Sequence, residues 1–297
     1  MEPLAWHVTH RLRDGRVLTS CPLEVRASAR SVLTLGARFN LVAFHLVDTH
    51  LHTLVACSRR EAGGFARTLE GVLRKRLLLP TPFERARFSP VESQRHLERA
   101  FLYILRQSAH HGLPQGPLFE GSNLLDLRGQ RVVGAYTRAL ATRLMPRMMT
   151  ASDLKIVGHR PTPQGLQPSI AVECALVASS LPTISGKAHP QREARAALAQ
   201  ALDAAKWSSL AREMGVTRAA LSRARCGKPR VATELVEAIR RCLGSATRSE
   251  AAIRRPELDG PGRIAGSAVE RGAPEGAVPF AWRSDARWAH GELPSPG

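Results

Sequence analysis

The hydrophobic and polar positions along the first part of the chain follow the two periods that distinguish strands from helices. Residues 4–12, LAWHVTHRL, mix apolar residues with β-formers and predict a first strand. Residues 23–36 repeat apolar positions at helical spacing and predict a helix. Two strand-like runs span 41–57, separated only by the polar pair Asp48 and Thr49, which predicts a tight antiparallel hairpin.

The pattern after this hairpin is mainly helical. Residues 64–79 keep apolar side chains at helical spacing until two prolines end the run. A further helix is expected over 90–111, followed by a glycine that favours a helix end. Residues 125–155 predict one or two more helices, so residues 1–155 form a first folded domain of mixed strands and helices.

The composition changes beyond residue 155. Residues 156–190 are rich in Pro, Gly and Ser and predict a linker. Residues 191–245 are helical and basic, which predicts an all-α second domain. Residues 246–297 combine Pro, Gly, Ala and Arg without apolar periodicity, so this tail is predicted to be disordered.

The charge of the chain indicates what it binds. Lysine and arginine number 43 against 25 acidic residues, a formal net charge of +18, which favours a polyanion such as nucleic acid. No apolar run reaches the roughly 18 residues of a membrane span, so a soluble, cytoplasmic protein without a membrane partner is expected. The five cysteines are scattered and form no CxxC pair, which argues against a disulfide framework or a zinc ribbon.

The predicted hairpin carries the first candidate chemistry. His50 and His52 are two residues apart on a strand, so both imidazoles lie on one face and can share a metal ion. Their apolar surroundings favour this hypothesis, because burying two polar rings without partners is costly. His-x-His pairs also arise by chance in a chain with 11 histidines, and an ordinary surface or core pair is the alternative.

Tyr103 and Gln107 supply the other candidate groups. The chain has two tyrosines, and Tyr103 lies four residues before Gln107, so the two are neighbours on one face of the predicted helix. A glutamine oxygen beside two imidazoles gives a mixed donor set that suits Mg²⁺ or Mn²⁺. In the alternative, the Tyr103 ring packs on the core and Gln107 is solvated.

Together these residues resemble the HUH single-strand endonucleases, specifically the REP-associated tyrosine transposases, which are related to the smallest bacterial insertion-sequence transposases. Members carry a His-hydrophobic-His strand, as in His50-Leu51-His52, and a later helix with a tyrosine followed four residues on by Asn or Gln. The segment LYILRQSAHHGL at 102–113 is similar in length and ending. The opening Trp6-His7-Val8-Thr9 also looks like the family's first strand.

The resemblance covers roughly residues 3–150 and implies a fold and a reaction. The fold is a ferredoxin-like antiparallel sheet with helices, of the α+β class. His50, His52 and Gln107 would hold Mg²⁺ or Mn²⁺, and Tyr103 would attack a phosphodiester of single-stranded or hairpin DNA. The products would be a 5′-phosphotyrosine and a free 3′-hydroxyl, and the protein would be a monomer or homodimer.

The helix predicted over 64–79 is the candidate for phosphate contacts near the cleavage point. Its basic residues are Arg67, Arg74, Lys75 and Arg76. The alternative is an ordinary solvated face of a helix, which would carry the same charges.

Residues 207–225, WSSLAREMGVTRAALSRAR, predict a helix-turn-helix unit that binds duplex DNA. Leu210 and Met214 would anchor the first helix, Gly215 would make the turn, and Thr217 would cap the second helix. The candidate DNA-binding residues on that second helix are Arg218, Ser222, Arg223 and Arg225. A small helical bundle with no DNA-binding role is the alternative.

Three hypotheses of function follow. The first is an active DNA-cleaving transposase-like enzyme, the second a catalytically silent DNA-binding regulator derived from one, and the third an RNA-binding protein, which gives the histidine pair no role. The remaining histidines, among them His7, His10, His96, His110 and His111, are expected to be structural, with a change to the metal shell as the alternative. His45 is expected to face away from His50, since five residues separate them.

Overall fold

The sheet in the N-terminal half contains one strand more than the sequence predicted. The computed structural model describes residues 2–113, 118–148, 167–202, 207–226 and 232–253. The strands are β1 (Ala5–Arg11), β2 (Leu41–Leu46), β3 (His50–Val55) and β4 (Arg87–Val91), in the order β2-β3-β1-β4, with every neighbouring pair antiparallel. The predicted first strand and the predicted hairpin are confirmed.

β4 is the strand that the sequence pattern did not reveal. It contains Pro90, which cannot donate a ladder hydrogen bond, and it lies at the edge of the sheet next to β1. The helix predicted over 90–111 is therefore wrong at its start. Helix α3 (Gln94–Leu105) begins later, where the Ser93 hydroxyl accepts a hydrogen bond from the His96 backbone N–H at 3.2 Å.

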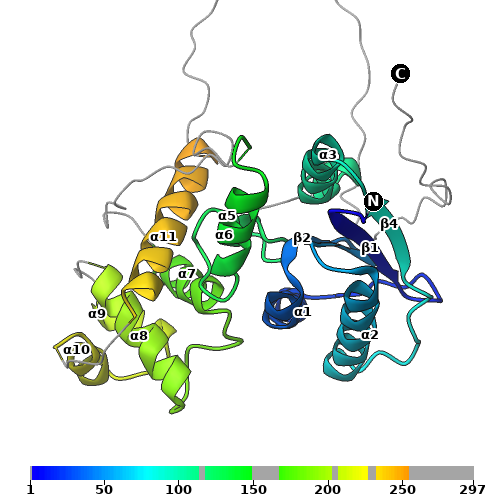
Figure 1. Cartoon of the computed structure of the whole chain (residues 1–297). Coiled ribbons are helices and arrows are strands. Elements are labelled where there is room, and N and C mark those ends of the chain that lie inside the picture. Colours follow the sequence, from blue (N-terminus) through cyan, green and yellow to red (C-terminus); the bar gives the residue numbers. More distant parts are fainter. Residues whose placement is uncertain (1, 114–117, 149–166, 203–206, 227–231, 254–297) are drawn as a thin grey trace, which may run out of the picture. The chain divides into compact units, whose positions relative to one another are not determined.

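Helices cover the two faces of the sheet separately. Figure 1 shows α1 (Pro22–Gly36) and α2 (Arg59–Arg76) on one side of the strands and α3 on the other. The helix predicted over 23–36 is α1. The helix predicted over 64–79 is α2, which begins earlier because Ser58 and Glu61 form a capping box. The Glu61 N–H donates to the Ser58 hydroxyl at 3.3 Å, and the Ser58 N–H donates to the Glu61 carboxylate at 2.9 Å.

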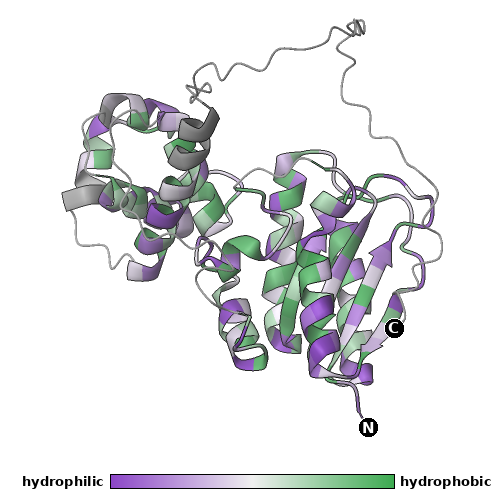
Figure 2. Ribbon diagram, turned by 90° about the horizontal axis from the view of Figure 1, so that it is seen from above, coloured by the Kyte–Doolittle hydropathy of each residue, from purple (hydrophilic) through white to green (hydrophobic). Residues whose placement is uncertain are grey.

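Each face of the sheet has its own apolar core. The core under α1 and α2 includes the fully buried Phe44 and Phe65, and the core under α3 includes Leu54, Phe101 and Ile104. Burying each of these side chains stabilises the fold by about 1.5–3 kcal/mol. The helices alternate hydrophobic and hydrophilic stripes, as expected for elements buried along one side (Figure 2).

The outer edge of β2 is hydrogen-bonded by a later segment of the chain. The Leu46 N–H donates to the Gly121 carbonyl at 2.6 Å. The Asn123 side chain accepts from the Phe44 N–H at 3.1 Å and donates to the Val42 carbonyl at 2.9 Å. One asparagine thereby replaces the hydrogen bonds that another strand would make.

Arg131 holds this segment in place. Its guanidinium is buried, donates to the carbonyls of Glu120 and Ser122 at 2.9 and 2.8 Å, and forms an ion pair with the buried Asp126 at 2.5 Å. Every one of these partners is close to Arg131 in sequence. The bidentate geometry compensates a charge that would otherwise be costly to bury.

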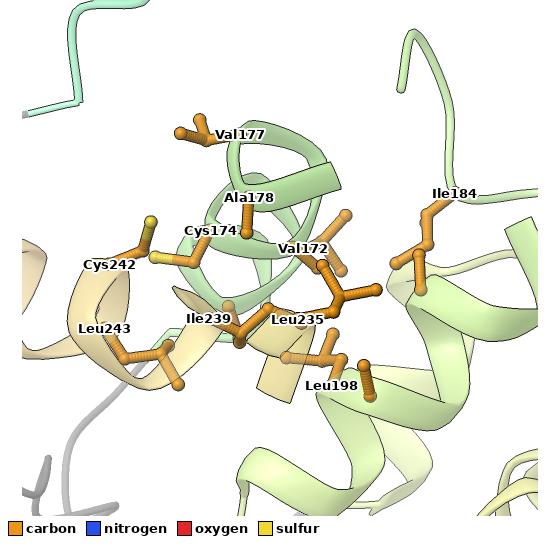
Figure 3. Close-up of a cluster of buried hydrophobic side chains, with 14 of the residues drawn as sticks. Val172, Cys174, Val177, Ala178, Ile184, Leu198, Leu235, Ile239, Cys242 and Leu243 are labelled. Carbon is orange, nitrogen blue, oxygen red and sulfur yellow. The ribbon is translucent and has the colours of Figure 1, made fainter. Parts of the chain in front are cut away.

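Helices α7 (Pro168–Ser179), α8 (His189–Ala201), α9 (Trp207–Glu213), α10 (Arg218–Cys226) and α11 (Thr233–Ile253) surround a further core. Helix α6 (Ala135–Leu144) packs instead on the core under α3, and α5 (Leu124–Leu127) contributes to both cores. Cys174, Leu198 and Ile239 pack together from α7, α8 and α11 (Figure 3). Burial raises the pKa of the Cys174 thiol to about 12, which keeps this free thiol protonated.

Helix α7 lies where the composition predicted a linker over 156–190. Its middle, IAVECALVA, is apolar on nearly all sides and largely buried, and Pro168 stands in the first turn, where a helix tolerates proline. The residues that suggested a linker are concentrated at the flanks of this helix, and 156–166 lie outside the described residues. Helix α11 also continues past the predicted boundary at 245, while 254–297 lie outside the described residues.

Charged and polar contacts join α1 to α7. Arg26 of α1 forms ion pairs with Glu120, at 2.6 Å, and with Glu173 of α7. Arg30 donates to the Ser180 carbonyl at 3.0 Å.

Within the described part of the chain, no helix combines the length and apolar character required to cross a membrane.

Candidate active site

The antiparallel register gathers histidines from three strands on one face of the sheet. His50 and His52 point to the same side of β3, as their spacing predicted. His45 of β2 stands directly opposite His52. His7 of β1 lies diagonally across from His52, and its Nε2 is 2.9 Å from His52 Nδ1. We call the face that carries His7, His45, His50 and His52 the histidine face.

The expectation that His45 faces away from His50 is wrong. The two residues belong to different strands, because β2 ends at Leu46 and β3 begins at His50. Counting residues along one strand does not apply across a turn, where the pairing register decides which side chains share a face. Pairing the two predicted strands about the polar turn would have placed His45 opposite His52. His10, by contrast, points to the other face.

Tyr103 reaches the histidine face from α3. The centroid of its ring is 5.8 Å from that of His52 and 5.9 Å from that of His7, with both pairs edge-on. His110 stands on the other side of the tyrosine, at 5.5 Å between centroids. The phenol therefore lies among three imidazoles rather than in the apolar core alone.

Gln107 belongs to a separate short helix, α4 (Gln107–His110), since the predicted continuous helix breaks at Arg106. The Gln107 amide Nε2 donates to the Tyr103 carbonyl at 3.2 Å, which spans the break. After α4, the His111 ring lies 5.2 Å from that of His50. The sequence pattern gave His110 and His111 no place at the site, and the structure puts their rings beside those of Tyr103 and His50 respectively.

Three buried polar atoms on or beside the histidine face lack a hydrogen-bond partner among the described residues: His45 Nδ1, His52 Nε2 and Gln107 Oε1. His52 is 5% exposed and Gln107 is 0% exposed. Leaving such a buried polar atom unsatisfied costs about 1–3 kcal/mol. His52 Nε2 and Gln107 Oε1 are electron-pair donors, so binding a cation would remove that cost for each of them.

Burial keeps the imidazoles of the histidine face neutral at pH 7. It lowers the pKa of His7, His45 and His50 from 6.5 to about 4 and lowers the pKa of His52 well below 6.5. Neighbouring histidines lower these pKa values further, and at His50 the charge of Asp48 opposes the shift while Arg11 adds to it. A neutral imidazole has the free lone pair that binding a cation requires.

The predicted donor set of His50, His52 and Gln107 contains two histidines only. Among the described residues, no group of three or more His, Cys, Asp or Glu side chains is arranged to hold a metal ion. Two imidazoles and one amide oxygen fit a cation such as Mg²⁺ or Mn²⁺ that completes its coordination with water or phosphate oxygens. The unpartnered Nε2 and Oε1 atoms are the observation that agrees with this chemistry.

The candidate phosphate contacts on α2 do not lie at this site. Helix α2 packs on the face opposite the histidine face, against the core that contains Phe65 and Leu69. Its exposed basic residues are Arg67, Arg74, Lys75 and Arg76. The sheet therefore lies between these four cations and Tyr103, and a phosphate at the tyrosine cannot also contact them.

Helices α9 and α10 have the local features predicted for the second basic unit. Met214 and Leu221 are buried, and Gly215 adopts φ +64° in the turn between the helices, a conformation that favours glycine. The Thr217 hydroxyl accepts from the Ala220 N–H at 3.1 Å, which caps α10. On α10, Arg218 and Ser222 are exposed, and the side chains of Arg223 and Arg225 lie outside the described residues.

The histidine face has no counterpart that a comparison of the whole chain with known proteins could supply. Comparisons with protein-family models, with curated proteins and with solved structures found no match. The function therefore has to be inferred from the residues of the histidine face and from their geometry.

Proposed function

We propose that this chain is a transposase-like endonuclease that cleaves and rejoins single-stranded or hairpin DNA, with Tyr103 as the nucleophile. The observation that carries the proposal is that the Tyr103 ring lies beside those of His52 and His7, while His50 shares their face of the sheet and the Gln107 amide bonds the Tyr103 carbonyl. The order of elements, β1-α1-β2-β3-α2-β4 with strand order β2-β3-β1-β4, also agrees with a ferredoxin-like arrangement.

The chain's own residues account for the nucleophile and its position. The Tyr103 oxygen forms a bond to phosphorus, and its proton leaves. The bond from phosphorus to the 3′ oxygen breaks, and that oxygen takes up a proton. The products are a 5′-phosphotyrosine and a free 3′-hydroxyl. The number of phosphoester bonds is conserved, so rejoining can run the same step backwards without an external energy source.

His50, His52 and Gln107 would hold Mg²⁺ or Mn²⁺. Such an ion, when bound, polarises the scissile phosphodiester. His7 contacts the ring of His52, and His45 bonds the neighbour of Gln107, since its Nε2 is 2.8 Å from the Ser108 hydroxyl. These contacts orient the donors before DNA arrives.

We also propose that α9 and α10 form a helix-turn-helix unit that binds duplex DNA. The glycine turn, the threonine cap and the exposed Arg218 and Ser222 support this assignment. The net charge of +18 favours a nucleic-acid partner for the chain as a whole.

A covalent-adduct assay tests the proposal. The protein is incubated with hairpin-bearing oligonucleotides and Mn²⁺, then separated on a denaturing gel. A label at the 3′ end of the oligonucleotide should migrate with the protein, and a label at the 5′ end should appear on a released fragment, because the tyrosine retains the 5′-phosphate. Tyr103→Phe should abolish the adduct.

Tyr136→Phe is the matched control, since Tyr136 is the second of two tyrosines in the chain. Its hydroxyl donates to the Leu33 carbonyl at 2.9 Å, and it packs with the core on the other side of the sheet. The adduct should persist in this variant. An adduct lost in both variants, or in neither, would contradict the role of Tyr103. Duplex binding without any adduct would instead support a catalytically silent regulator.

A further inference from the structure

Two exposed arginines share the histidine face. Arg11 of β1 stands directly opposite His50 in the register of β1 with β3. Arg87 of β4 stands opposite Thr9, which itself stands opposite His52. Because directly paired residues of antiparallel strands point to the same side, both arginine side chains leave the sheet on the side of the histidines.

The strand positions around these arginines carry no carboxylate, and the acidic group nearby is Asp48, in the turn before β3, whose charge acts on His50. On this face, β1 contributes Ala5, His7, Thr9 and Arg11, and β4 contributes Arg87, Ser89 and Val91. None of these is a carboxylate. Arg87 and Ser89 are exposed, so β4 presents a cation and a hydroxyl to solvent beside the histidines.

The spacing between the strands would allow a DNA strand at Tyr103 to contact both arginines. Neighbouring strands are about 4.8 Å apart, so the backbone at Arg87 is roughly 10 Å from that at His52, with Thr9 between them. An arginine side chain covers most of that span. A phosphate at Tyr103 would therefore have neighbouring phosphates within reach of Arg11 and Arg87, whereas the α2 cations lie behind the sheet.

We propose that the strip formed by Arg11, Thr9, Arg87 and Ser89 is the path of the single strand's phosphates to Tyr103, in place of the basic face of α2. The inference rests on the proposed function, because it takes single-stranded DNA as the ligand of the histidine face. Arginine suits this role since its fork of N–H donors matches phosphate oxygens.

Salt dependence of binding separates this path from general attraction by a basic protein. Single-strand affinity falls with salt in proportion to the number of phosphates contacted, with about 0.7 in the logarithmic slope for each. The probe is a fluorescent single-stranded oligonucleotide, titrated by anisotropy without metal. All variants carry Tyr103→Phe so that no strand is cleaved. Two double variants are compared, Arg11→Gln/Arg87→Gln and Arg67→Gln/Arg74→Gln.

The two double variants remove the same charge from opposite faces of the sheet. The first should lower the magnitude of the salt slope by about 1.4, and the second should leave it near the parent value. All four arginines are exposed, and thermal melting should confirm that both variants stay folded. Equal loss in both variants, or loss only in the α2 variant, would overturn the proposed path.

Different results would refute the proposed phosphate path and the proposed cleavage by Tyr103. An adduct at Tyr103 together with an unchanged slope in Arg11→Gln/Arg87→Gln would overturn the path alone. A shifted slope without any adduct would support the path and refute cleavage by Tyr103.

Discussion

Replacing His7 tests how the sheet prepares His52 to bind a cation. His52 can present an Nε2 lone pair only when its proton is on Nδ1, and that Nδ1–H then donates to His7 Nε2, 2.9 Å away. His7→Phe keeps a ring of similar size but removes the acceptor. The Thr9 hydroxyl, at 3.4 Å, is the other group within reach of Nδ1.

The expected magnitude follows from the hydrogen bond of His7 to His52, which we propose as a metal ligand. Loss of a partner that orients a metal-binding histidine weakens metal affinity by about 10–100-fold. This corresponds to about 1.4–2.7 kcal/mol of binding free energy. His7→Gln should lose less than His7→Phe, because the glutamine oxygen can still accept from His52 Nδ1–H.

Isothermal titration of the protein with Mn²⁺, in the absence of DNA, measures this directly. Thermal melting of each variant checks that a change in affinity does not come from unfolding. If His7→Phe binds Mn²⁺ with the same Kd as the parent protein, the hydrogen bond between His7 and His52 has no role in cation binding, and the reasoning fails.

Three further predictions concern the framework of the site. Arg131→Met leaves the Asp126 carboxylate buried without its cation, so urea unfolding should show a loss of about 3–5 kcal/mol, and Arg131→Met/Asp126→Leu should lose less. Acid should destabilise the metal-free protein, because the pKa values of His7, His45 and His50 are about 4 in the folded state and 6.5 in the unfolded state. The stability that these neutral histidines contribute above pH 6.5 is lost as the pH falls toward 4. The loss in unfolding free energy is up to about 1.4 kcal/mol per histidine for each pH unit. A free energy of unfolding that stays constant between pH 7 and 4.5 would contradict this. Thr217→Ala should cost about 1 kcal/mol through loss of the α10 cap, measured by urea unfolding and refuted by an unchanged midpoint.

Local periodicity was sufficient to predict half of the candidate site. Period two in β3 placed His50 and His52 on one face, and helical spacing placed Tyr103 and Gln107 near each other despite the break at Arg106. These relations depend only on residues close in sequence. The residues that we propose as metal ligands and nucleophile were therefore accessible to sequence reasoning.

The rest of the site depends on pairing between distant segments. His7 and His45 reach His52 only through the registers of β1 and β2 with β3. The side of the sheet on which a helix packs is also a tertiary property, so the sequence could not show that the charges of α2 lie on the face opposite Tyr103. Pro90 concealed β4, and the polar flanks of α7 concealed a buried helix.

The two edges of the sheet limit how molecules of this protein can associate through their strands. The β4 edge is short, contains Pro90 and carries an arginine, while the β2 edge is already bonded to Gly121 and Asn123. Neither edge offers a long row of free backbone groups, which is what intermolecular strand addition and amyloid-like growth require. The fold can therefore leave a polar, partly open sheet face available to a ligand without making that sheet a template for aggregation.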